Sequence, residues 1–337
     1  MKNIHAIKKL AKERAFLYLD EMFEKYSHFP ILEYYPNFEE KKYLGWHFRY
    51  PSPYLHANVM YALLNSSFEE THNLLQKATP FLLNFKEPGD IWRFWNSGVA
   101  DHAVFCGTDD TAIASIVLEK LNRKIDNKKI LFSCINKGGT INTWITSNFK
   151  LLVINPIAWF WLMKQDKPVK KTINLGFLKK EDIDTNITLN TLMYLGINQK
   201  TECVQQYIID VWRKKRSPHF LYYINKTVFA YHIARAYKEG IHGFSVIKES
   251  ILQYFEDEID KLEFAELLMG FLSMKYFKFD KSILNEFEHR INKKIKLEND
   301  IFIKPFPLIT GVNRRYFGGG GCLTAAWFIE FCKYSSQ

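Results

Sequence analysis

Apolar residues recur at intervals of three and four along almost the whole chain, and this spacing predicts helices in preference to strands. About twelve helices are expected, over residues 3–27, 53–65, 69–84, 109–122, 155–164, 184–195, 200–214, 226–239, 244–256, 260–275, 280–293 and 322–334. Ser52-Pro53 and Asn155-Pro156 support two of these starts, because proline is favoured at the first helical position. The best strand candidate, Lys129–Ile135, is short. We therefore expect an all-α protein.

The composition indicates one large domain. The chain has 337 residues, of which 47% are hydrophobic and 24% charged, so it can bury a substantial core and is not disordered. No change in composition marks a domain boundary within residues 1–337. Pro305, Pro307 and a run of glycines interrupt the helices at residues 296–321, where we expect a loop insertion.

The compartment is expected to be the cytoplasm. The apolar stretch Leu151–Met163 is interrupted by Asn155 and Pro156 and is shorter than the roughly 20 residues of a membrane span. The charged start of the chain lacks the apolar middle of a signal peptide. Five scattered cysteines without a Cys-x-x-Cys pair favour a reducing compartment. The net charge of +10 contains no basic tract longer than Arg213–Arg216, so we expect a solvated basic surface and no nucleic-acid partner.

Four segments that combine glycine or aromatic residues each lead into a helix with small residues in its first turns. They are Gly89–Trp95, Gly138–Trp144, Phe220–Tyr223 and Arg315–Gly319. Helical hairpins whose connecting loops carry the same element are typical of repeat architectures. We therefore expect a closed ring of hairpins, an α/α toroid, with the loops and the starts of the inner helices around one central cavity.

The segment Cys106–Ala114 places two adjacent carboxylates, Asp109 and Asp110, where a helix begins. One interpretation is structural: Thr108 or Asp109 caps the helix, and acidic side chains in the first turn interact favourably with its dipole. The other interpretation is that the pair performs acid chemistry.

The sequence Asp109-Asp110-Thr111-Ala112 resembles the end of the Asp-x-Asp-Asp-Thr-Ala motif of class II terpene cyclases, the squalene–hopene cyclase family. The loops with Gly139 and Trp144, the run Gly318–Gly321 and the segment Gly321–Phe328 also resemble that family's repeats. The resemblance implies an α/α barrel and a redox-neutral cyclisation of a linear isoprenoid that begins with protonation of an alkene or epoxide. It makes Asp109 the Brønsted acid and Asp110 its support.

The chain departs from the family's motif at its first aspartate, where it has Gly107. Neighbouring charges and hydrogen bonds adjust the strength of a buried carboxylic acid, so the loss of one carboxyl leaves a weaker or differently supported acid. The substrate would then be one that is easier to protonate, such as an epoxide, or another group would substitute, or the site would not be catalytic.

Aromatic side chains are the expected walls of such a cavity, because ring faces stabilise a cation within about 6 Å. The candidates on the repeat loops and adjoining helices are Trp92, Trp95, Trp144, Tyr222, Tyr223, Tyr231 and Phe317. Each of these rings would equally fill a helical core. His102 and His232 are candidates to hydrogen-bond the acid or to reload its proton, although a helix histidine that only packs in the core is the commoner case.

A prenyl diphosphate substrate would need basic side chains. The candidates are Arg49, Arg93, Arg235, Arg314 and Arg315, of which Arg314 and Arg315 precede the flexible glycine run. No cofactor is otherwise required, and a diphosphate would bring Mg²⁺ with it. The arrangement of Asp101, His102 and Cys106 does not match the Asp-x-Cys spacing of zinc-dependent prenyltransferases, so no metal site is expected.

Two other functions stay open. A carbohydrate-active enzyme on the same toroid would need a second carboxylate about 5–10 Å from the first, for which the chain offers Asp90, Asp101, Asp182 and Asp184. A non-catalytic relative would bind a lipid or a protein partner in the ring. The expected partner is a small-molecule isoprenoid; peripheral membrane contact and the oligomeric state are left open.

Overall fold

The computed structural model describes residues 2–37, 42–48, 51–94, 105–174, 179, 182–223, 225–297, 301, 307–310 and 317–335. Side chains are described for residues 4–31, 51–94, 105–165, 179, 182–223, 225–297, 301 and 320–335. All statements below concern these residues.

The described chain is mostly helical, and its helices confirm the all-α prediction. They are α1 (Lys2–Tyr26), α2 (Pro53–Ser66), α3 (Glu69–Asn84), α4 (Thr108–Lys120), α5 (Lys128–Ser133), α6 (Phe149–Ile154), α7 (Pro156–Asn174), α8 (Thr185–Leu195), α9 (Glu202–Trp212), α10 (Lys226–Lys238), α11 (Lys248–Glu258), α12 (Phe264–Tyr276), α13 (Lys281–Leu297) and α14 (Gly321–Ser335), with the 3₁₀ helix η1 (His242–Ile247) before α11. Every predicted helix is present, and most bounds agree within a few residues. The apolar periodicity predicted these helices correctly because each segment buries at least one of its faces.

The predicted strand at Lys129–Ile135 is wrong, because these residues form the helix α5 and its end. A short apolar run does not distinguish a strand from a buried helical turn. The start of α5 is held by tertiary contacts: the Asn127 side chain donates to Ser115 Oγ at 2.8 Å and to the backbone carbonyl of Asp90. Neither contact is visible in the local sequence.

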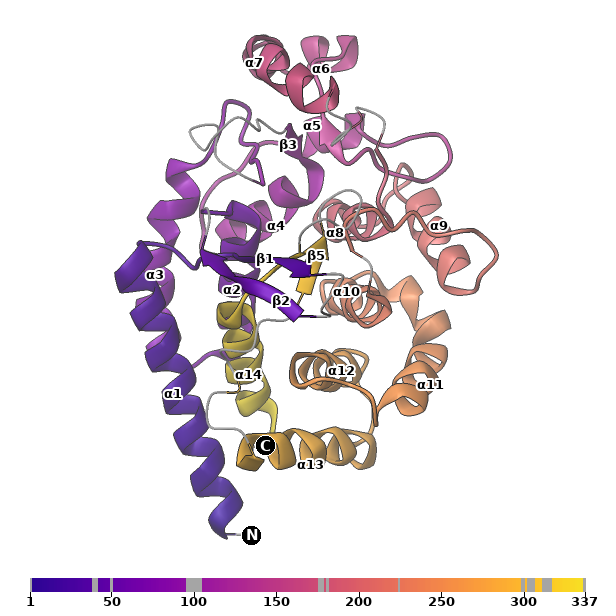
Figure 1. Cartoon of the computed structure of the whole chain (residues 1–337). Helices are drawn as coiled ribbons and strands as arrows, with labels where there is room; N and C mark the ends of the chain where they lie inside the picture. Colours follow the sequence, from indigo (N-terminus) through magenta and orange to yellow (C-terminus); the bar gives the residue numbers. More distant parts are fainter. Residues whose placement is uncertain are drawn as a thin grey trace.

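Six helices pack against one another in a cyclic order. α2 contacts α4, α4 contacts α8, α8 contacts α10, α10 contacts α12, α12 contacts α14, and α14 contacts α2. In Figure 1 these six helices lie inside, while α1, α3, α9, α11 and α13 lie around them. The outer helices contact the inner ones: α1 packs on α14, α3 on α2, α9 on α8, α11 on α10 and α13 on α12.

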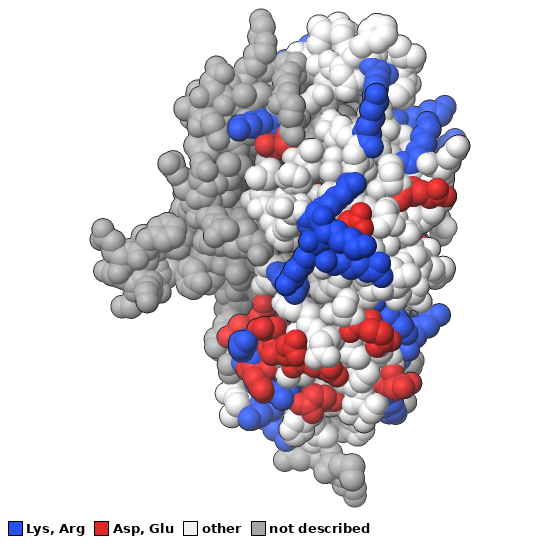
Figure 2. Space-filling view, turned by 90° about the vertical axis from the view of Figure 1, so that its right-hand side faces the viewer, with Lys and Arg blue, Asp and Glu red and all other residues white. Residues whose placement is uncertain are grey.

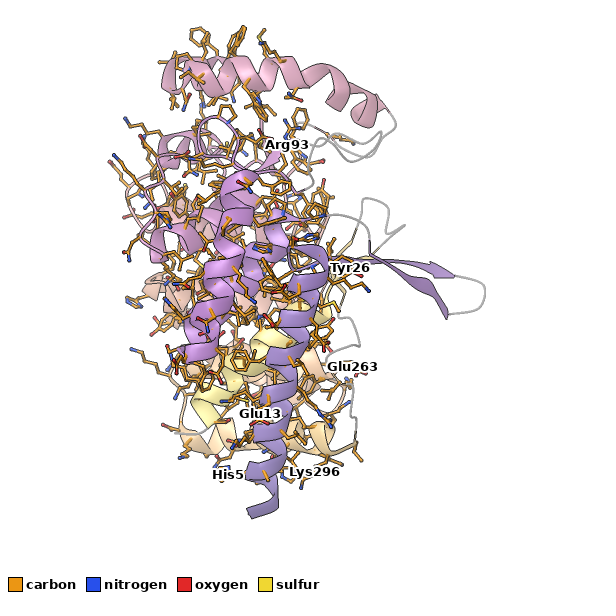
Figure 3. All side chains as sticks on the ribbon, turned by 90° about the vertical axis from the view of Figure 1, so that its left-hand side faces the viewer. His5, Glu13, Tyr26, Arg93, Glu263 and Lys296 are labelled. Atoms are coloured by element: carbon orange, nitrogen blue, oxygen red, sulfur yellow. The ribbon has the colours of Figure 1, made fainter. Side chains whose placement is uncertain are left out.

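A four-stranded antiparallel sheet lies in front of the inner helices in Figure 1. Its strand order is β2 (Lys42–Phe48), β1 (Leu32–Asn37), β6 (Phe317–Gly319) and β5 (Pro307–Thr310). The hairpin of β1 and β2 projects from the helical body in Figure 3. Two of the strands fall within residues 296–321, so this expected loop contributes to a sheet through the pairing of Tyr34 with Phe317. Sheet pairing across such a sequence distance leaves no local pattern.

The inner helices are buried on all sides. All eleven residues of α8 and almost all of α2 are buried, including asparagine, threonine and histidine side chains. Polar groups in such positions must find partners inside the protein. No helix in the described part of the chain is long and apolar enough to cross a membrane.

Candidate functional site

The start of α4 is anchored by backbone pairing. The short strand β3 (Cys106–Gly107) pairs with β4 (Trp144–Ile145), and the Thr108 amide donates to the Thr143 carbonyl at 2.9 Å. Gly107 is the N-cap residue, and no side chain caps the helix. The interpretation that Thr108 or Asp109 caps the helix is therefore wrong, because Thr108 Oγ1 donates to the Asn142 carbonyl and Asp109 already lies inside the helix; both aspartates do lie in its first turn.

Asp109 is a buried carboxyl with two hydrogen-bond donors. Its Oδ2 accepts from the Tyr223 hydroxyl at 2.7 Å, and its Oδ1 accepts from the Asp110 amide at 3.0 Å. Burial raises the pKa of Asp109 to about 7; the Tyr223 hydrogen bond opposes this rise, and the negative charge of Asp184 adds to it. A carboxyl in this environment can carry a proton near neutral pH and can still be stabilised once the proton has left.

Gly107 makes room for the second carboxyl. A Cβ at position 107 would overlap Asp110 Oδ2 and would lie 3.3 Å from Asp109 Oδ1. Burial raises the pKa of Asp110 well above its usual range, the charge of Asp109 raises it further, and a hydrogen bond with the Gly107 backbone lowers it. A side chain at position 107 would therefore need space that the Asp110 carboxyl occupies.

Asp184 holds the loop that carries Tyr223, and each of its two oxygens accepts from two backbone amides. Oδ1 accepts from the amides of Asn186 and Ile187 at the start of α8, and Oδ2 accepts from the amides of Leu221 and Tyr222 at 2.8 and 2.9 Å. Burial raises the pKa of Asp184 to about 6, although these four hydrogen bonds lower it. This carboxyl therefore ties α8 to the loop before α10 and sets the place of the Tyr223 hydroxyl.

The predicted His232 lies on α10 beside Tyr223, but it hydrogen-bonds elsewhere. Its Nδ1 is 3.1 Å from Asn186 Oδ1, and its ring centroid lies 5.6 Å from that of Tyr223 and 5.9 Å from that of Tyr231. Burial lowers the pKa of His232 well below its ordinary value, and the nearby Arg235 lowers it further. The imidazole is therefore neutral, and its ring packs on Tyr223, whose hydroxyl donates to Asp109.

One turn below His232, Arg235 crosses the interior of the six helices. Its guanidinium donates to Asn58 Oδ1 on α2 at 2.7 Å and to Asn190 Oδ1 on α8 at 2.9 Å. It also lies 5.0 Å from the centroid of the Tyr61 ring. Arg235 is 1% exposed, and no acidic side chain in the described part of the chain forms an ion pair with it. Because the guanidinium has no such ion pair, the surrounding oxygens and ring faces must replace the water that would solvate its charge.

Three buried polar atoms around this interior find no hydrogen-bond partner among the described residues: Asn186 Nδ2, Asn190 Nδ2 and Arg235 Nε. Tyr54 interacts electrostatically with both Asp109 and Arg235, and its hydroxyl hydrogen-bonds with that of Tyr223. All three atoms carry hydrogens that they can donate. The interior between Asp109 and Arg235 therefore presents a surplus of donors, which suits a bound group that accepts hydrogen bonds.

The structure separates the predicted aromatic walls into two groups. Tyr223 and Tyr231 face this interior, where the Tyr231 hydroxyl accepts from Trp327 Nε1 at 3.0 Å. The other three described candidates are held by structural contacts. Trp92 donates its indole N–H to the Leu82 carbonyl, and both Trp144 and Tyr222 donate to Asp182 Oδ2. Trp95, His102, Arg314 and Arg315 lie outside the described residues, as does the side chain of Phe317.

Tyr54 and Asn58 are the site residues that the sequence reasoning missed. They are one helical turn apart on α2, as Asn186 and Asn190 are on α8. Polar side chains four residues apart on one face of a helix were the available signal.

Within the described ranges, no group of three or more His, Cys, Asp or Glu side chains is arranged to hold a metal ion. In comparisons with known proteins, no family model and no curated protein matches the chain.

Proposed function

We propose that the chain is an α/α toroid and that Asp109 protonates a linear isoprenoid to start its cyclisation. The cyclic packing order of α2, α4, α8, α10, α12 and α14 supports the toroid. The observation that supports the reaction is the environment of Asp109. This carboxyl is buried in an interior rich in tyrosine, its pKa is raised to about 7, and it accepts a hydrogen bond from the Tyr223 hydroxyl. Such a carboxyl suits general acid catalysis.

The proton moves from Asp109 to the substrate, and a ring closes as an alkene π pair attacks the cation so formed. The Asp109 carboxylate that remains is stabilised by the hydrogen bonds from Tyr223 and the Asp110 amide. A proton lost from the cyclised cation restores charge balance, so the product is an isomer of the substrate. An acid with a pKa near 7 is weak for an isolated alkene, and this favours an epoxide, whose oxygen is far more basic.

The donors around Arg235 agree with an oxygen-bearing substrate. An epoxide oxygen, or the alcohol that it becomes, accepts hydrogen bonds, and Tyr54 lies within electrostatic reach of Asp109. The faces of Tyr223 and Tyr231 would stabilise the cation on the same side. If the substrate is instead a prenyl diphosphate, Arg235 is the described side chain best placed to bind its charge, and Mg²⁺ would accompany it.

Product analysis tests the proposal. The purified chain is incubated with terminal isoprenoid epoxides, squalene and geranyl, farnesyl and geranylgeranyl diphosphates, with and without Mg²⁺, and extracts are analysed by mass spectrometry. We expect a cyclic isomer from the wild type and a loss of about 10²–10⁴-fold in its rate of formation with Asp109→Asn. Asp257→Asn, an exposed carboxyl on α11, is the control and should retain activity. A cyclic product that survives Asp109→Asn would overturn the role of this residue.

A non-catalytic lipid-binding relative is the second candidate, and Gly107 is the observation that favours it. The motif's first carboxyl is absent, and its place is filled by Asp110. No turnover across the panel by a folded protein would support this function.

The carbohydrate-active alternative lacks a free second carboxylate among the described candidates. Asp184 is fully engaged by backbone amides, Asp182 accepts from Trp144 and Tyr222, and Asp90 pairs with Lys86.

A further inference from the structure

The α6–α7 hairpin exposes large apolar side chains along one face. Of the thirteen large hydrophobic residues exposed in the described chain, six lie here: Phe149, Val153, Ile154, Ile157, Phe160 and Met163. Phe149, Val153 and Ile157 are 77%, 70% and 74% exposed. Scattered apolar residues on a surface need no explanation, but a contiguous patch on one element marks an interaction site.

The hairpin is anchored by its opposite face, so the exposure does not result from a helix that lacks any packing. Ala158 and Leu162 of α7 and Leu151 of α6 are buried. The Trp161 ring lies 4.6 Å from the guanidinium carbon of Arg93, which Figure 3 shows directly beneath α7. In the same view α7 crosses the upper edge of the molecule and carries side chains on its outward side. The inward apolar face of α7 packs on the protein, so its outward apolar face calls for a second apolar environment.

The charge of this segment identifies the second environment. Between Phe149 and Gln165 the only charged residues are Lys150 and Lys164, and no acidic residue occurs. The whole of α7 contains four lysines and one aspartate. Lys164 Nζ lies 4.6 Å from the centroid of the exposed Phe160 ring. In Figure 2 the top of the molecule is mostly uncharged, with basic side chains just below it.

We propose that the outward face of α6–α7 binds the surface of an anionic lipid membrane. Helices that lie in the membrane interface combine an apolar face with lysines that reach the headgroups, and their binding increases with apolar area and with lipid charge. Phe149, Val153, Ile157 and Phe160 would enter the boundary of the acyl chains, while Lys150 and Lys164 contact phosphate groups. This surface lies on a different element from Asp109, so the inference does not depend on the proposed reaction.

Vesicle co-sedimentation tests this surface. The wild type is expected to bind vesicles of phosphatidylcholine and phosphatidylglycerol, more weakly as salt is raised, and to bind pure phosphatidylcholine at least tenfold less. The double variant Ile157→Ser/Phe160→Ser should lose at least tenfold of the binding to anionic vesicles. Leu17→Ser, an exposed leucine on α1, is the matched control and should bind as the wild type does. Circular dichroism verifies that each variant is folded.

A charge variant and an oligomer measurement complete the test. Lys150→Glu/Lys164→Glu should reduce binding to anionic vesicles and leave the apolar face in place. The proposal is overturned if Ile157→Ser/Phe160→Ser binds anionic vesicles as well as the wild type. It is also overturned if the wild type binds no vesicles and light scattering shows a dimer that this variant dissociates, since the face would then join two copies of the chain.

Discussion

The interior of the six helices buries polar side chains, whereas the outer face of the α6–α7 hairpin exposes apolar ones. The interior buries Asp109, His232 and Arg235, each less than 6% exposed, whereas the hairpin exposes Phe149 and Ile157 by more than 70%. Inside, the chain supplies hydrogen-bond partners for the buried groups. On the hairpin, no described residue covers the apolar face.

This difference separates stability from binding. A buried polar group is costly when it loses its partner, so substitutions inside the ring should change the free energy of unfolding. An exposed apolar side chain contributes little to folding, so substitutions on the hairpin should change binding alone. Denaturation of variants in the two regions tests this separation.

The largest effect should be the pH dependence of stability that arises from Asp109. Its pKa is raised on folding, so the native state holds a proton that the unfolded state releases, and stability falls as pH rises from about 4 to about 7. Asp109→Asn mimics the protonated form and removes this loss. We expect the free energy of unfolding of the variant, relative to wild type, to rise across this window by on the order of 4 kcal/mol.

Urea denaturation at several pH values measures this difference. Comparison with the variant cancels the opposite contributions of His56 and His232, whose lowered pKa values destabilise the native state as pH falls below about 6.5. A difference between variant and wild type that stays constant from pH 4 to pH 7 would show that Asp109 has an ordinary pKa.

Asn190→Leu should be the next most severe change. It removes the oxygen that accepts from Arg235 and leaves an N–H of a buried cation without a partner, at a cost of about 3 kcal/mol. Chemical denaturation measures this cost. Gln253→Leu, on the exposed side of α11, is the control and should stay within about 0.5 kcal/mol of wild type. A cost below about 1 kcal/mol for Asn190→Leu would mean that Arg235 finds another acceptor.

Gly107→Ala should destabilise the protein by about 2 kcal/mol, because the added Cβ overlaps Asp110 Oδ2. The backbone at Gly107 has φ −85°, which alanine adopts without strain, so the cost comes from side-chain contacts, chiefly the overlap with Asp110. In the Asp110→Ala background the same substitution should cost less than about 0.5 kcal/mol. Equal costs in the two backgrounds of this double-mutant cycle would exclude the contact with Asp110 as the cause.

The smallest effect on stability is expected on the hairpin. Ile157→Ser replaces a side chain that is 74% exposed, so the free energy of unfolding should change by no more than about 0.5 kcal/mol. Leu189→Ala on α8, which is fully buried, should lose about 2–5 kcal/mol in the same denaturation series. A large loss from Ile157→Ser would show that the outward face packs against the rest of the chain.

Within the candidate site, the sequence could supply only what has a local signal. It placed the pair Asp109-Asp110 at a helix start, and it named Tyr223 on the loop before α10 and His232 on α10 as candidates. The pairing among them was not predicted, because the Tyr223 hydroxyl and Asp109 are separated by 114 residues along the chain. His232 was a candidate to hydrogen-bond the acid, and it contacts Asn186 and the Tyr223 ring, while the Tyr223 hydroxyl donates to Asp109.

The sequence by itself determined the helices, since apolar periodicity and proline starts act over a few residues and are decided by burial of one face. It also determined that acidic residues begin α4. Only the tertiary structure decided that Asp109 is buried, that Asp110 occupies the space left by Gly107, and that Arg235 meets Asn58 across 177 residues. Burial and long-range hydrogen bonds depend on which helices become neighbours, and that choice is made by the packing of the whole chain.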